Sequence, residues 1–432
     1  MSTRTVARLT VQPGPAGVLA VASALPAALL GDGPALALLP AGPAQLMERL
    51  LARIRPDDPT NPLETPDVAI VVATSGSTGE PQGVLLTAAN LIRAAQASDA
   101  RLGGPARWVL ALPVDHVGGL AVLVRSHLAG VPVLPIASIG GAATFSAEEF
   151  RRTTETARSL ADRDGTPLRT ALVPTQLSRL VELGPAAQEC LTAYDTILVG
   201  GAAAPTGLLD SARKLGAMIV TTYGMTETCG GVVYDGYALD DVTVSITEPD
   251  AHGFGRIELT GPTVAVGYRL QPDLTERYFA GPNSAGVRSH RTRDCGHIGS
   301  TGTLTVSGRL DDVVKVGGMK VSIAAVEAAA QRAPGVREAA VVATHDPEWG
   351  SLITAFVTTE PAEHPAENRI VGGVTRWVEN TLGKESRPRD VLVLSTLPTL
   401  PNGKIDRSAL RRIAADRRVP AGPRSNDAGS EG

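Results

Sequence analysis

From residue 67 onward, the chain alternates between short apolar runs and longer amphipathic stretches. A short apolar run bounded by turn residues predicts a buried strand, and an amphipathic stretch of several turns predicts a helix. The predicted strands cover residues 68–73, 108–112, 131–136, 170–173, 196–199 and 218–221, and the predicted helices cover 88–102, 118–129, 146–162 and 208–215. Strands that alternate with helices are typical of crossover units, so we expect a largely parallel sheet covered by helices.

The pattern changes after Gly231 and again near Arg309. Short β-rich pieces at 257–259, 264–268 and 303–306 predict a small barrel or sheet attached to the α/β core. Beyond Arg309 the pattern predicts helices at 323–332 and 371–382, and strands at 339–343, 352–358 and 390–394. The expected fold is therefore a large α/β N-terminal domain (1–308) with a β-rich barrel, and a smaller α+β C-terminal domain (309–416). The tail at 417–432 is rich in Pro, Gly and Ser, and we expect it to be disordered.

Charge and composition exclude several classes of protein. The chain has 40 Lys and Arg against 44 Asp and Glu, and only 3% aromatic residues, which argues against a nucleic-acid binder. Three scattered cysteines fit neither a disulfide framework nor a zinc site, and they favour a reducing cytoplasm. The apolar run at 18–30 is too short to span a membrane and contains Pro26, so it predicts a buried strand and helix rather than an export signal. We expect a cytoplasmic protein without membrane insertion. The sequence leaves open whether it forms a homo-oligomer and what residues 1–60 do.

Lysine is rare in this chain, because only five of the 40 basic residues are lysines. They are Lys214, Lys315, Lys320, Lys384 and Lys404. A chain that uses arginine almost everywhere is expected to keep lysine where a compact ammonium is required. Four of the five lie after residue 310, so we look there for chemistry.

A loop rich in hydroxyl groups and glycine follows the first strand predicted in the α/β core. Residues 74–83 read Thr-Ser-Gly-Ser-Thr-Gly-Glu-Pro-Gln-Gly. Glycine lets a backbone approach an anion, and exposed N–H groups can face it, so this loop can wrap a polyphosphate. It lacks the Gly-Lys-Ser/Thr of a Walker A loop. The alternative is an ordinary surface loop.

Three further segments carry candidate chemistry. In Tyr-Gly-Met-Thr-Glu-Thr at 223–228, directly after a predicted strand, the aromatic ring could stack on a base and the carboxylate could hold Mg²⁺. The alternative is a helix N-terminus capped by Thr226. Asp294 and Arg309 could clamp the hydroxyls of a ribose, or each could belong to a surface ion pair. Lys404 lies on a predicted turn, Pro-Asn-Gly-Lys, and could reach into a cleft or remain a solvated side chain.

Together, in this order, the motifs resemble those of the acyl-adenylate-forming superfamily, which contains acyl-CoA ligases, luciferases and adenylation domains of peptide synthetases. The resemblance extends from about residue 67 to residue 410. Within the superfamily, Leu-Pro-Val-Asp-His-Val-Gly-Gly at 112–119 and Leu-Val-Pro-Thr-Gln-Leu at 172–177 look like segments of the o-succinylbenzoate–CoA ligases of menaquinone synthesis. The resemblance implies a ligase that uses ATP, Mg²⁺ and coenzyme A on a small carboxylic acid, with AMP and pyrophosphate released.

The resemblance also implies roles for individual residues. The ATP phosphates would contact Thr74, Ser75, Gly76, Ser77, Thr78 and Gly79. The adenine would be framed by Gly200, Gly201, Ala202 and Tyr223, and Gly224 would also bind the cofactor. Thr226 would contact the α-phosphate, Glu227 would bind Mg²⁺, and Asp294 with Arg309 would hold the ribose. Asp311 would be the hinge of a mobile C-terminal domain, and Lys404 the catalytic lysine of adenylation.

The acid site is expected near His116 and Thr175, because the resemblance places His116 beside the acyl pocket as a catalytic and substrate-binding residue. The alternative is that His116 is a packed or capping histidine after a strand. Arg125 lies in an otherwise apolar predicted helix, where a charge needs an anionic partner. Our hypothesis is that it pairs with the second carboxylate of a dicarboxylic acid. An internal ion pair or a solvent-reaching side chain remains the alternative.

This sequence departs from the family at Gln82, where the phosphate loop usually has lysine, and at Ile323, where proline is usual. The Gln82 change removes one cation from the nucleotide site. Three other functions stay open: a ligase for another aryl or aliphatic acid, a stand-alone adenylating enzyme, and a non-catalytic nucleotide-binding module.

Overall fold

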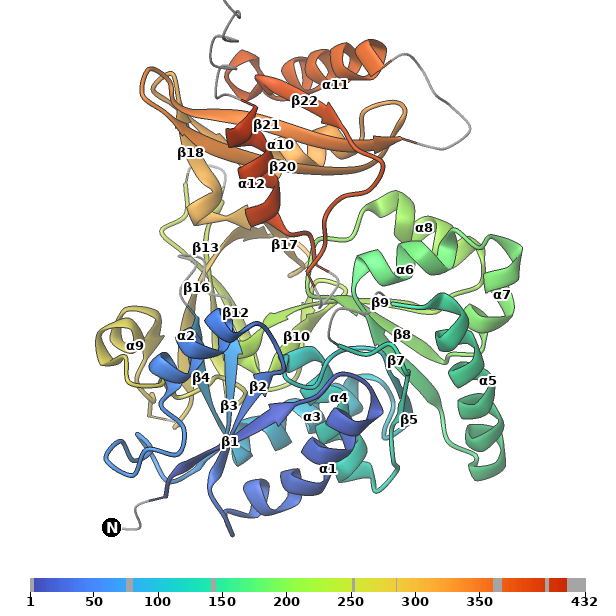
Figure 1. Ribbon diagram of the computed structural model, residues 1–432, viewed down its shortest axis with the longest axis vertical. Coiled ribbons are helices and arrows are strands. Elements are labelled where there is room, and N and C mark those ends of the chain that lie inside the picture. Colours follow the sequence, from blue (N-terminus) through green and yellow to red (C-terminus); the bar gives the residue numbers. More distant parts are fainter. Residues whose placement is uncertain are drawn as a thin grey trace, which may run out of the picture. The chain divides into compact units, whose positions relative to one another are not determined.

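The computed structural model describes residues 4–74, 81–140, 145–250, 253–284, 286–359, 367–400 and 404–417 (Figure 1). Ser75 to Gly79 of the expected phosphate loop, and the expected disordered tail from residue 418, lie outside the described residues. The chain divides into two compact units. The first comprises Met1–Ser307 and Pro401–Lys404, and the second Gly308–Leu400 and Ile405–Gly432.

The first sheet of the large unit has the strand order β1-β2-β3-β4-β14. Its strands are β1 (Val6–Val11), β2 (Ala35–Pro40), β3 (Val68–Thr74), β4 (Gln82–Thr87) and β14 (Gly267–Tyr268). The first three pair in parallel, whereas β4 runs antiparallel to β3. Of these, the sequence pattern predicted β3. The run at 18–30 is not a strand and a helix but lies wholly within one helix, α1 (Pro15–Leu30), which carries Pro26 inside it. Helix α2 (Ala44–Ile54) follows β2.

The second sheet is the parallel sheet that the sequence pattern predicted, with the order β11-β10-β9-β8-β7-β5-β6. Strands β6 to β9 pair in parallel with their neighbours or with β5, and β10 and β11 are antiparallel additions. The strands are β5 (Arg107–Leu110), β6 (Leu134–Pro135), β7 (Leu168–Leu172), β8 (Thr196–Gly200), β9 (Ile219–Met225), β10 (Gly230–Tyr234) and β11 (Tyr237–Ala238). Strand β6 is shorter than the predicted strand 131–136, because only two of those residues pair with β5.

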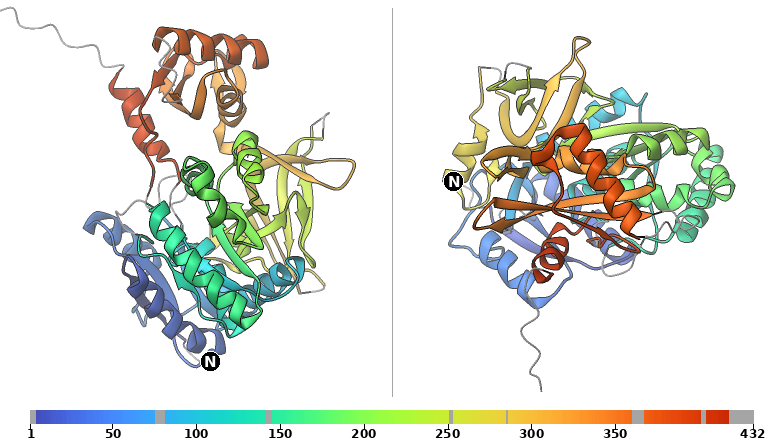
Figure 2. Two further views of the ribbon diagram at one scale, coloured as in Figure 1. Left: turned by 90° about the vertical axis from the view of Figure 1, so that its right-hand side faces the viewer. Right: turned by 90° about the horizontal axis from the view of Figure 1, so that it is seen from above.

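Helices cover both faces of this second sheet (Figures 1 and 2). Helices α3 (Ala88–Arg101) and α4 (Val117–Ala129) pack between it and the first sheet, where one apolar core joins the two sheets. Trp108 on β5 is fully buried in that core. The other face is covered by α5 (Ala147–Asp164), α6 (Pro174–Val181), α7 (Pro185–Thr192) and α8 (Thr206–Lys214). The carboxyl ends of the parallel strands therefore meet at one edge, the usual place for a ligand in such sheets.

The third sheet of the large unit corresponds to the predicted β-rich region. It has five strands, in the order β12-β13-β16-β15 with β17 beside β16. They are β12 (Thr243–Thr247), β13 (Gly255–Gly261), β15 (Phe279–Ala280), β16 (Arg288–Ile298) and β17 (Leu304–Arg309), with α9 (Pro272–Tyr278) before β15. One face of the sheet packs on an apolar cluster that includes Val233, Ile257 and Leu259. The predicted strand 264–268 is strand only at Gly267–Tyr268, which joins the first sheet instead.

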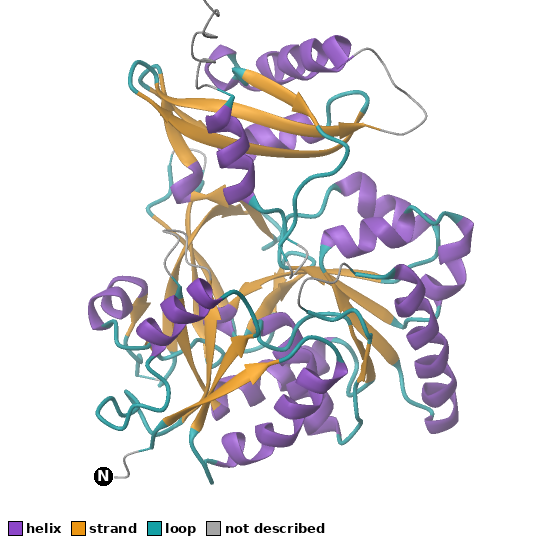
Figure 3. Ribbon diagram, viewed as in Figure 1, coloured by secondary structure: helices purple, strands orange, loops and turns teal. Residues whose placement is uncertain are grey.

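The second unit is a five-stranded sheet with helices on both faces (Figure 3). Its elements are β18 (Val313–Val316), β19 (Met319–Ser322), α10 (Ile323–Gln331), β20 (Val336–Asp346), β21 (Gly350–Thr359), α11 (Glu367–Leu382), β22 (Asp390–Val393) and α12 (Arg407–Asp416). This unit begins at Gly308, one residue before the expected boundary, and Pro401–Lys404 belong to the large unit. Gly308 has φ +141°, and a Cβ on it would lie 2.4 Å from Cβ of Ala324, so only glycine fits there.

No helix within the described parts of the chain is long and apolar enough to cross a membrane.

Candidate functional site

The segment 223–228 forms the carboxyl end of β9 and the turn after it. Strand β9 extends to Met225, so Tyr223 and Gly224 lie in the strand, and Thr226–Thr228 form one short 3₁₀ turn. Thr228 accepts a hydrogen bond from the Met225 N–H at 3.0 Å and donates to the Gly230 carbonyl at 2.9 Å. The alternative in which Thr226 caps a helix is therefore wrong, because Thr228 closes the turn. The turn leaves Thr226 and Glu227 half-buried at the edge of the sheet.

The Glu227 carboxylate interacts with two buried side chains from other elements. The Tyr268 hydroxyl donates to Oε1 of Glu227 at 2.8 Å. Burial, together with the charge of Glu227, raises the pKa of Tyr268, so this phenol stays protonated and acts as the donor. Burial lowers the pKa of His290, although the charge of Glu227 opposes that shift. Glu227 is thus a carboxylate with one oxygen held by a permanent donor.

The structure brings Tyr223 and Asp294 together from two motifs that lie 71 residues apart. The Tyr223 hydroxyl donates to Oδ2 of Asp294 at 2.8 Å. The Asp294 N–H donates to Thr292 Oγ1 at 3.1 Å, and that hydroxyl donates to the Ile257 carbonyl at 2.7 Å. Thr292, which is fully buried, thereby fixes the backbone that carries Asp294.

The expected adenine-framing residues 200–202 follow directly from the carboxyl end of β8. Gly200 is the last residue of β8, and a Cβ on it would lie 2.1 Å from Thr222 Oγ1 of the neighbouring strand. Only glycine therefore allows β8 and β9 to approach so closely at this edge. The predicted residues Gly200, Gly201, Ala202, Tyr223 and Gly224 lie at the ends of these two paired strands.

The base of the phosphate loop contains an arginine that the sequence patterns did not indicate. Thr74 and Gln82 pair across β3 and β4, so the two ends of the loop lie side by side. Gln82 is 7% exposed, and its Oε1 accepts a hydrogen bond from Nη2 of Arg53 at 3.3 Å. Arg53 also donates to Gln271. A guanidinium therefore lies next to the position where the family usually has lysine. Arg53 lies on α2, 29 positions before Gln82, so no pattern near the loop indicated this contact.

His116 and Thr175 both lie where a helix begins at the carboxyl edge of the second sheet. His116 immediately precedes α4, and its Nδ1 lies 3.3 Å from Oδ1 of the buried Asp115. Thr175 is in the first turn of α6. The next residue, Gln176, donates to the Ala111 carbonyl at 2.9 Å, which ties the end of β5 to the start of α6. The structure therefore places His116 and Thr175 at the same edge as the β9 turn.

Arg125 is not at that edge. It lies nine residues after His116 along α4, which is about 13 Å at the usual helical rise. Its side chain is 4% exposed, its Nη2 donates to the Tyr234 hydroxyl at 3.3 Å, and its guanidinium lies 5.4 Å from the Trp108 ring centroid. Burial raises the pKa of the nearby Asp99, and the charges of Arg125 and Arg169 oppose that shift. These contacts favour the alternative of internal partners over the hypothesis that Arg125 faces the acid.

We expect Arg125→Met to destabilise the fold without changing the KM for the acid. The Tyr234 hydroxyl would lose one partner and the Trp108 ring its cation, which together cost about 1–3 kcal/mol in the free energy of unfolding. Urea unfolding and steady-state kinetics measure the two quantities. Arg152→Met on the exposed face of α5 is the control and should leave both unchanged. A stable Arg125→Met protein with a KM raised tenfold would restore the substrate role.

The expected residues of the C-terminal region divide between the two units. Arg309 is the last residue of β17 and belongs to the second unit, and Asp311 lies in the 3₁₀ turn Leu310–Asp312, although its side chain lies outside the described part. Lys404 is grouped with the large unit, and its Cε lies 3.5 Å from where a Cβ on Gly201 would be. A β-bridge joins Thr399 and Ile405, which precede and follow Lys404 in the sequence.

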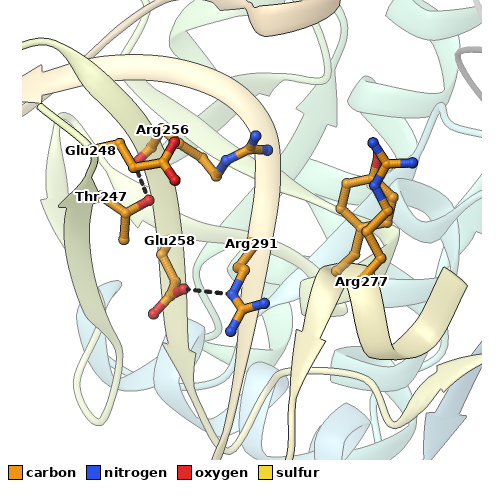
Figure 4. A pocket seen from close by; sticks show the side chains of 7 residues that line it. Thr247, Glu248, Arg256, Glu258, Arg277 and Arg291 are labelled. Atoms are coloured by element: carbon orange, nitrogen blue, oxygen red, sulfur yellow. Dashed lines mark hydrogen bonds and ion pairs between the residues drawn. The ribbon is translucent and has the colours of Figure 1, made fainter. Parts of the chain in front are cut away.

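A separate polar pocket of about 390 Å³ lies on the third sheet, on the face opposite its apolar cluster (Figure 4). Glu258 and Arg291 face each other across the paired strands at 3.6 Å, and Arg277 comes from α9. The pocket is lined by Thr247, Glu248, Arg256, Glu258, Arg277, Tyr278 and Arg291. None of the predicted site residues lines this pocket.

Comparison with known proteins agrees with this arrangement. The model of the AMP-binding enzyme family matches residues 22–268, and that of the AMP-binding enzyme C-terminal domain matches residues 325–404. A probable 2-succinylbenzoate–CoA ligase of Mycobacterium tuberculosis is 39% identical over 400 residues, which cover 91% of this chain and 95% of that protein. A 2-succinylbenzoate–CoA ligase of Listeria monocytogenes is 28% identical over 366 residues, covering 81% of this chain and 71% of that protein.

Solved structures share the fold. The o-succinylbenzoate CoA synthetase of Bacillus subtilis, solved with ATP and magnesium ion, has a TM-score of 0.74 at 23% identity and covers 95% of this chain and 90% of its own. MatB of Rhodopseudomonas palustris, solved with ATP, has a TM-score of 0.76 at 20% identity over 96% of this chain and 90% of its own. The match to both family models and the 39% identical relative lead to one conclusion. This chain belongs to the AMP-binding enzyme family.

Proposed function

We propose that this enzyme is the ATP-dependent ligase that converts o-succinylbenzoate into o-succinylbenzoyl-CoA through an acyl-adenylate. It would release AMP and pyrophosphate, and it would act in menaquinone synthesis in the cytoplasm. The observation that carries this proposal is the 39% identity with the M. tuberculosis relative along nearly the whole of both chains. The arrangement of titratable and hydroxyl groups at the edge of the second sheet supports it.

The ATP nucleoside would bind at the ends of β8 and β9. Gly200, Gly201, Ala202, Tyr223 and Gly224 would frame the adenine. Asp294 would accept hydrogen bonds from the ribose hydroxyls, and Arg309 would also bind the ribose. The hydrogen bond from Tyr223 to Asp294 supports this role, because it orients the carboxylate before ATP arrives.

Glu227 is the residue proposed to hold Mg²⁺. Its carboxylate can accept about four hydrogen bonds or ligand contacts, of which the Tyr268 hydroxyl occupies one. Within the described residues, no group of three or more His, Cys, Asp or Glu side chains is arranged to hold a metal. Mg²⁺ usually takes one or two carboxylates together with substrate phosphates rather than a cage of protein ligands, so the single Glu227 carboxylate is sufficient for this role. When bound, the ion supplies positive charge to the phosphate oxygens.

In the first half-reaction, the substrate carboxylate attacks the α-phosphorus of ATP and pyrophosphate leaves. Both reactants are anionic, so the enzyme must offset their repulsion and stabilise charge on the leaving group. Thr74, Ser75, Gly76, Ser77, Thr78 and Gly79 would donate to the phosphates. Thr226 would contact the α-phosphate, and Lys404 would bring an ammonium to the transferring group. The position of the Lys404 side chain close to Gly201, at the end of β8, is compatible with that role.

In the second half-reaction, the coenzyme A thiolate attacks the acyl carbon and AMP leaves. Lys404 is required only for the first step, so a rotation about Asp311 would let the same small domain serve both. Gly308 supports a hinge in this segment, because its backbone conformation is one that only glycine adopts easily. His116 and Thr175 would border the acid at the edge of the second sheet.

The acid is tested by AMP formation with ATP, Mg²⁺ and coenzyme A. We expect kcat/KM for o-succinylbenzoate to exceed that for benzoate, a medium-chain fatty acid or mixed amino acids by at least about 100-fold, because a site built for a polar substrate group rejects analogues that lack it. Glu227→Gln protein, prepared in the same way, shows how much AMP comes from contaminants. Turnover of only a monocarboxylic acid would keep the reaction class and overturn the assigned substrate and pathway.

A further inference from the structure

Tyr268 lies in an unusual position for a buried tyrosine, because its hydroxyl reaches a carboxylate at the edge of the nucleotide site. The residue belongs to β14, at the edge of the first sheet, whereas Glu227 belongs to the turn after β9 in the second sheet. A direct hydrogen bond of 2.8 Å therefore links the two sheets at the Glu227 carboxylate.

The Tyr268 ring is held from several sides. It is 6% exposed, and its edge meets the Phe279 ring with centroids 5.2 Å apart. Phe279 packs in turn on His290, and the centroids of these two rings are 4.6 Å apart. The Tyr268 N–H donates to Thr275 Oγ1 at 2.9 Å, which fixes the backbone as well. The constrained ring therefore holds this hydroxyl against Oε1 of Glu227.

Glu227 is held at its backbone too. Its carbonyl accepts a hydrogen bond from the Ala265 N–H at 2.8 Å, three residues before Tyr268. The segment 265–268 thus contacts Glu227 at both the main chain and Oε1. The Tyr268 hydroxyl therefore restrains rotation of the carboxylate about the torsions of the Glu227 side chain.

We infer that Tyr268 is a positioning residue for the metal-binding carboxylate: its hydroxyl holds Oε1 of Glu227 so that Oε2 presents to the divalent cation that accompanies ATP. The inference rests on the proposed function, because it takes Glu227 as the ligand. Partners that hydrogen-bond a metal ligand typically change metal affinity by about 10–100-fold when they are removed.

The test is Tyr268→Phe, which keeps the ring and removes only the hydroxyl. Titration with Mn²⁺, followed by its EPR signal in the presence of a non-hydrolysable ATP analogue, measures cation affinity without turnover. We expect the dissociation constant of Mn²⁺ to rise about 10-fold or more. Calorimetry of the metal-free analogue should give the same affinity as in the parent protein, because Tyr268 acts through the carboxylate and not through the nucleotide.

Tyr234→Phe is the matched control. It also removes a buried tyrosine hydroxyl that is hydrogen-bonded, in this case to Ser98 at 2.8 Å and to Arg125. It should lower the unfolding midpoint without changing Mn²⁺ affinity. Equal Mn²⁺ affinity in Tyr268→Phe and the parent protein would overturn the inference, as would an equal loss in both tyrosine variants.

Glu227→Gln separates this inference from the function on which it rests. If Glu227→Gln weakens Mn²⁺ binding and Tyr268→Phe does not, the positioning role fails and the metal site stands. If Glu227→Gln binds Mn²⁺ as tightly as the parent protein, Glu227 is not the ligand. In that case the metal role of Glu227 and the positioning role of Tyr268 are both wrong.

Discussion

Lys404→Ala is expected to lower the rate of acyl-adenylate formation by about 10²–10³-fold, which corresponds to roughly 3–4 kcal/mol of transition-state stabilisation. The substrate carboxylate and the α-phosphate repel each other, and no other lysine lies in the motifs that resemble the nucleotide site. Removing the ammonium would therefore leave the charge on the transferring phosphoryl group and departing pyrophosphate less compensated. The loss should appear mainly in kcat, because the interaction develops in the transition state.

The measurement is the exchange of labelled pyrophosphate into ATP, which reports the first half-reaction alone. Release of AMP from a chemically prepared acyl-adenylate and coenzyme A reports the second half-reaction, and we expect that rate to stay within about twofold. Lys384→Ala removes an exposed lysine from the second unit and is the control for loss of charge. Equal losses in both half-reactions would contradict a role restricted to adenylation.

Asp294→Ala is expected to lower kcat/KM for ATP by about 10²-fold, because hydrogen bonds to a charged group contribute about 1.5–3 kcal/mol each. The carboxylate is held in place by Tyr223, and Thr292 fixes its backbone, so the parent protein binds the ribose without reorganising this group. The variant should retain its fold, since Asp294 is only partly buried.

ATP analogues make this test specific for the ribose. In the parent protein, 2′-deoxy-ATP and 3′-deoxy-ATP should each be poorer substrates than ATP, whereas Asp294→Ala should use all three about equally. Asp273→Ala, on the exposed side of α9, controls for the loss of one negative charge and should keep the parent preference. If Asp294→Ala still discriminates against the deoxy analogues as strongly as the parent protein, the ribose is bound elsewhere.

Much of the core of the large unit follows from the order of apolar and polar residues. The strands β3, β5, β7, β8 and β9 were all predicted, because each is a short apolar run between turn residues. The two strands β1 and β2 were missed. The run Ala35–Pro40 is rich in Ala and Leu, which favour helix intrinsically, and it becomes a strand because β1 and β3 pair with it on both sides.

In the candidate site, too, some features were predicted from the sequence and others were not. The motifs predicted which residue types would be used, because an anionic substrate, a base and a metal each require particular chemical groups. They did not predict Arg53 at Gln82 or Tyr268 at Glu227, since these contacts join residues 29 and 41 positions apart on different elements. Arg125 shows the converse, because its burial was foreseen but the identity of its partner was not.

The sequence by itself therefore determined the reaction class and the parallel architecture, through local patterns of residue type that need no knowledge of distant contacts. The tertiary structure alone decided which side chains meet. Strand pairing brought Tyr268 to Glu227 and Tyr223 to Asp294, and the direction of α4 carried Arg125 away from the edge of the sheet. Such contacts depend on the register and orientation of whole elements, which are set by packing across the core and not by any short segment of the chain.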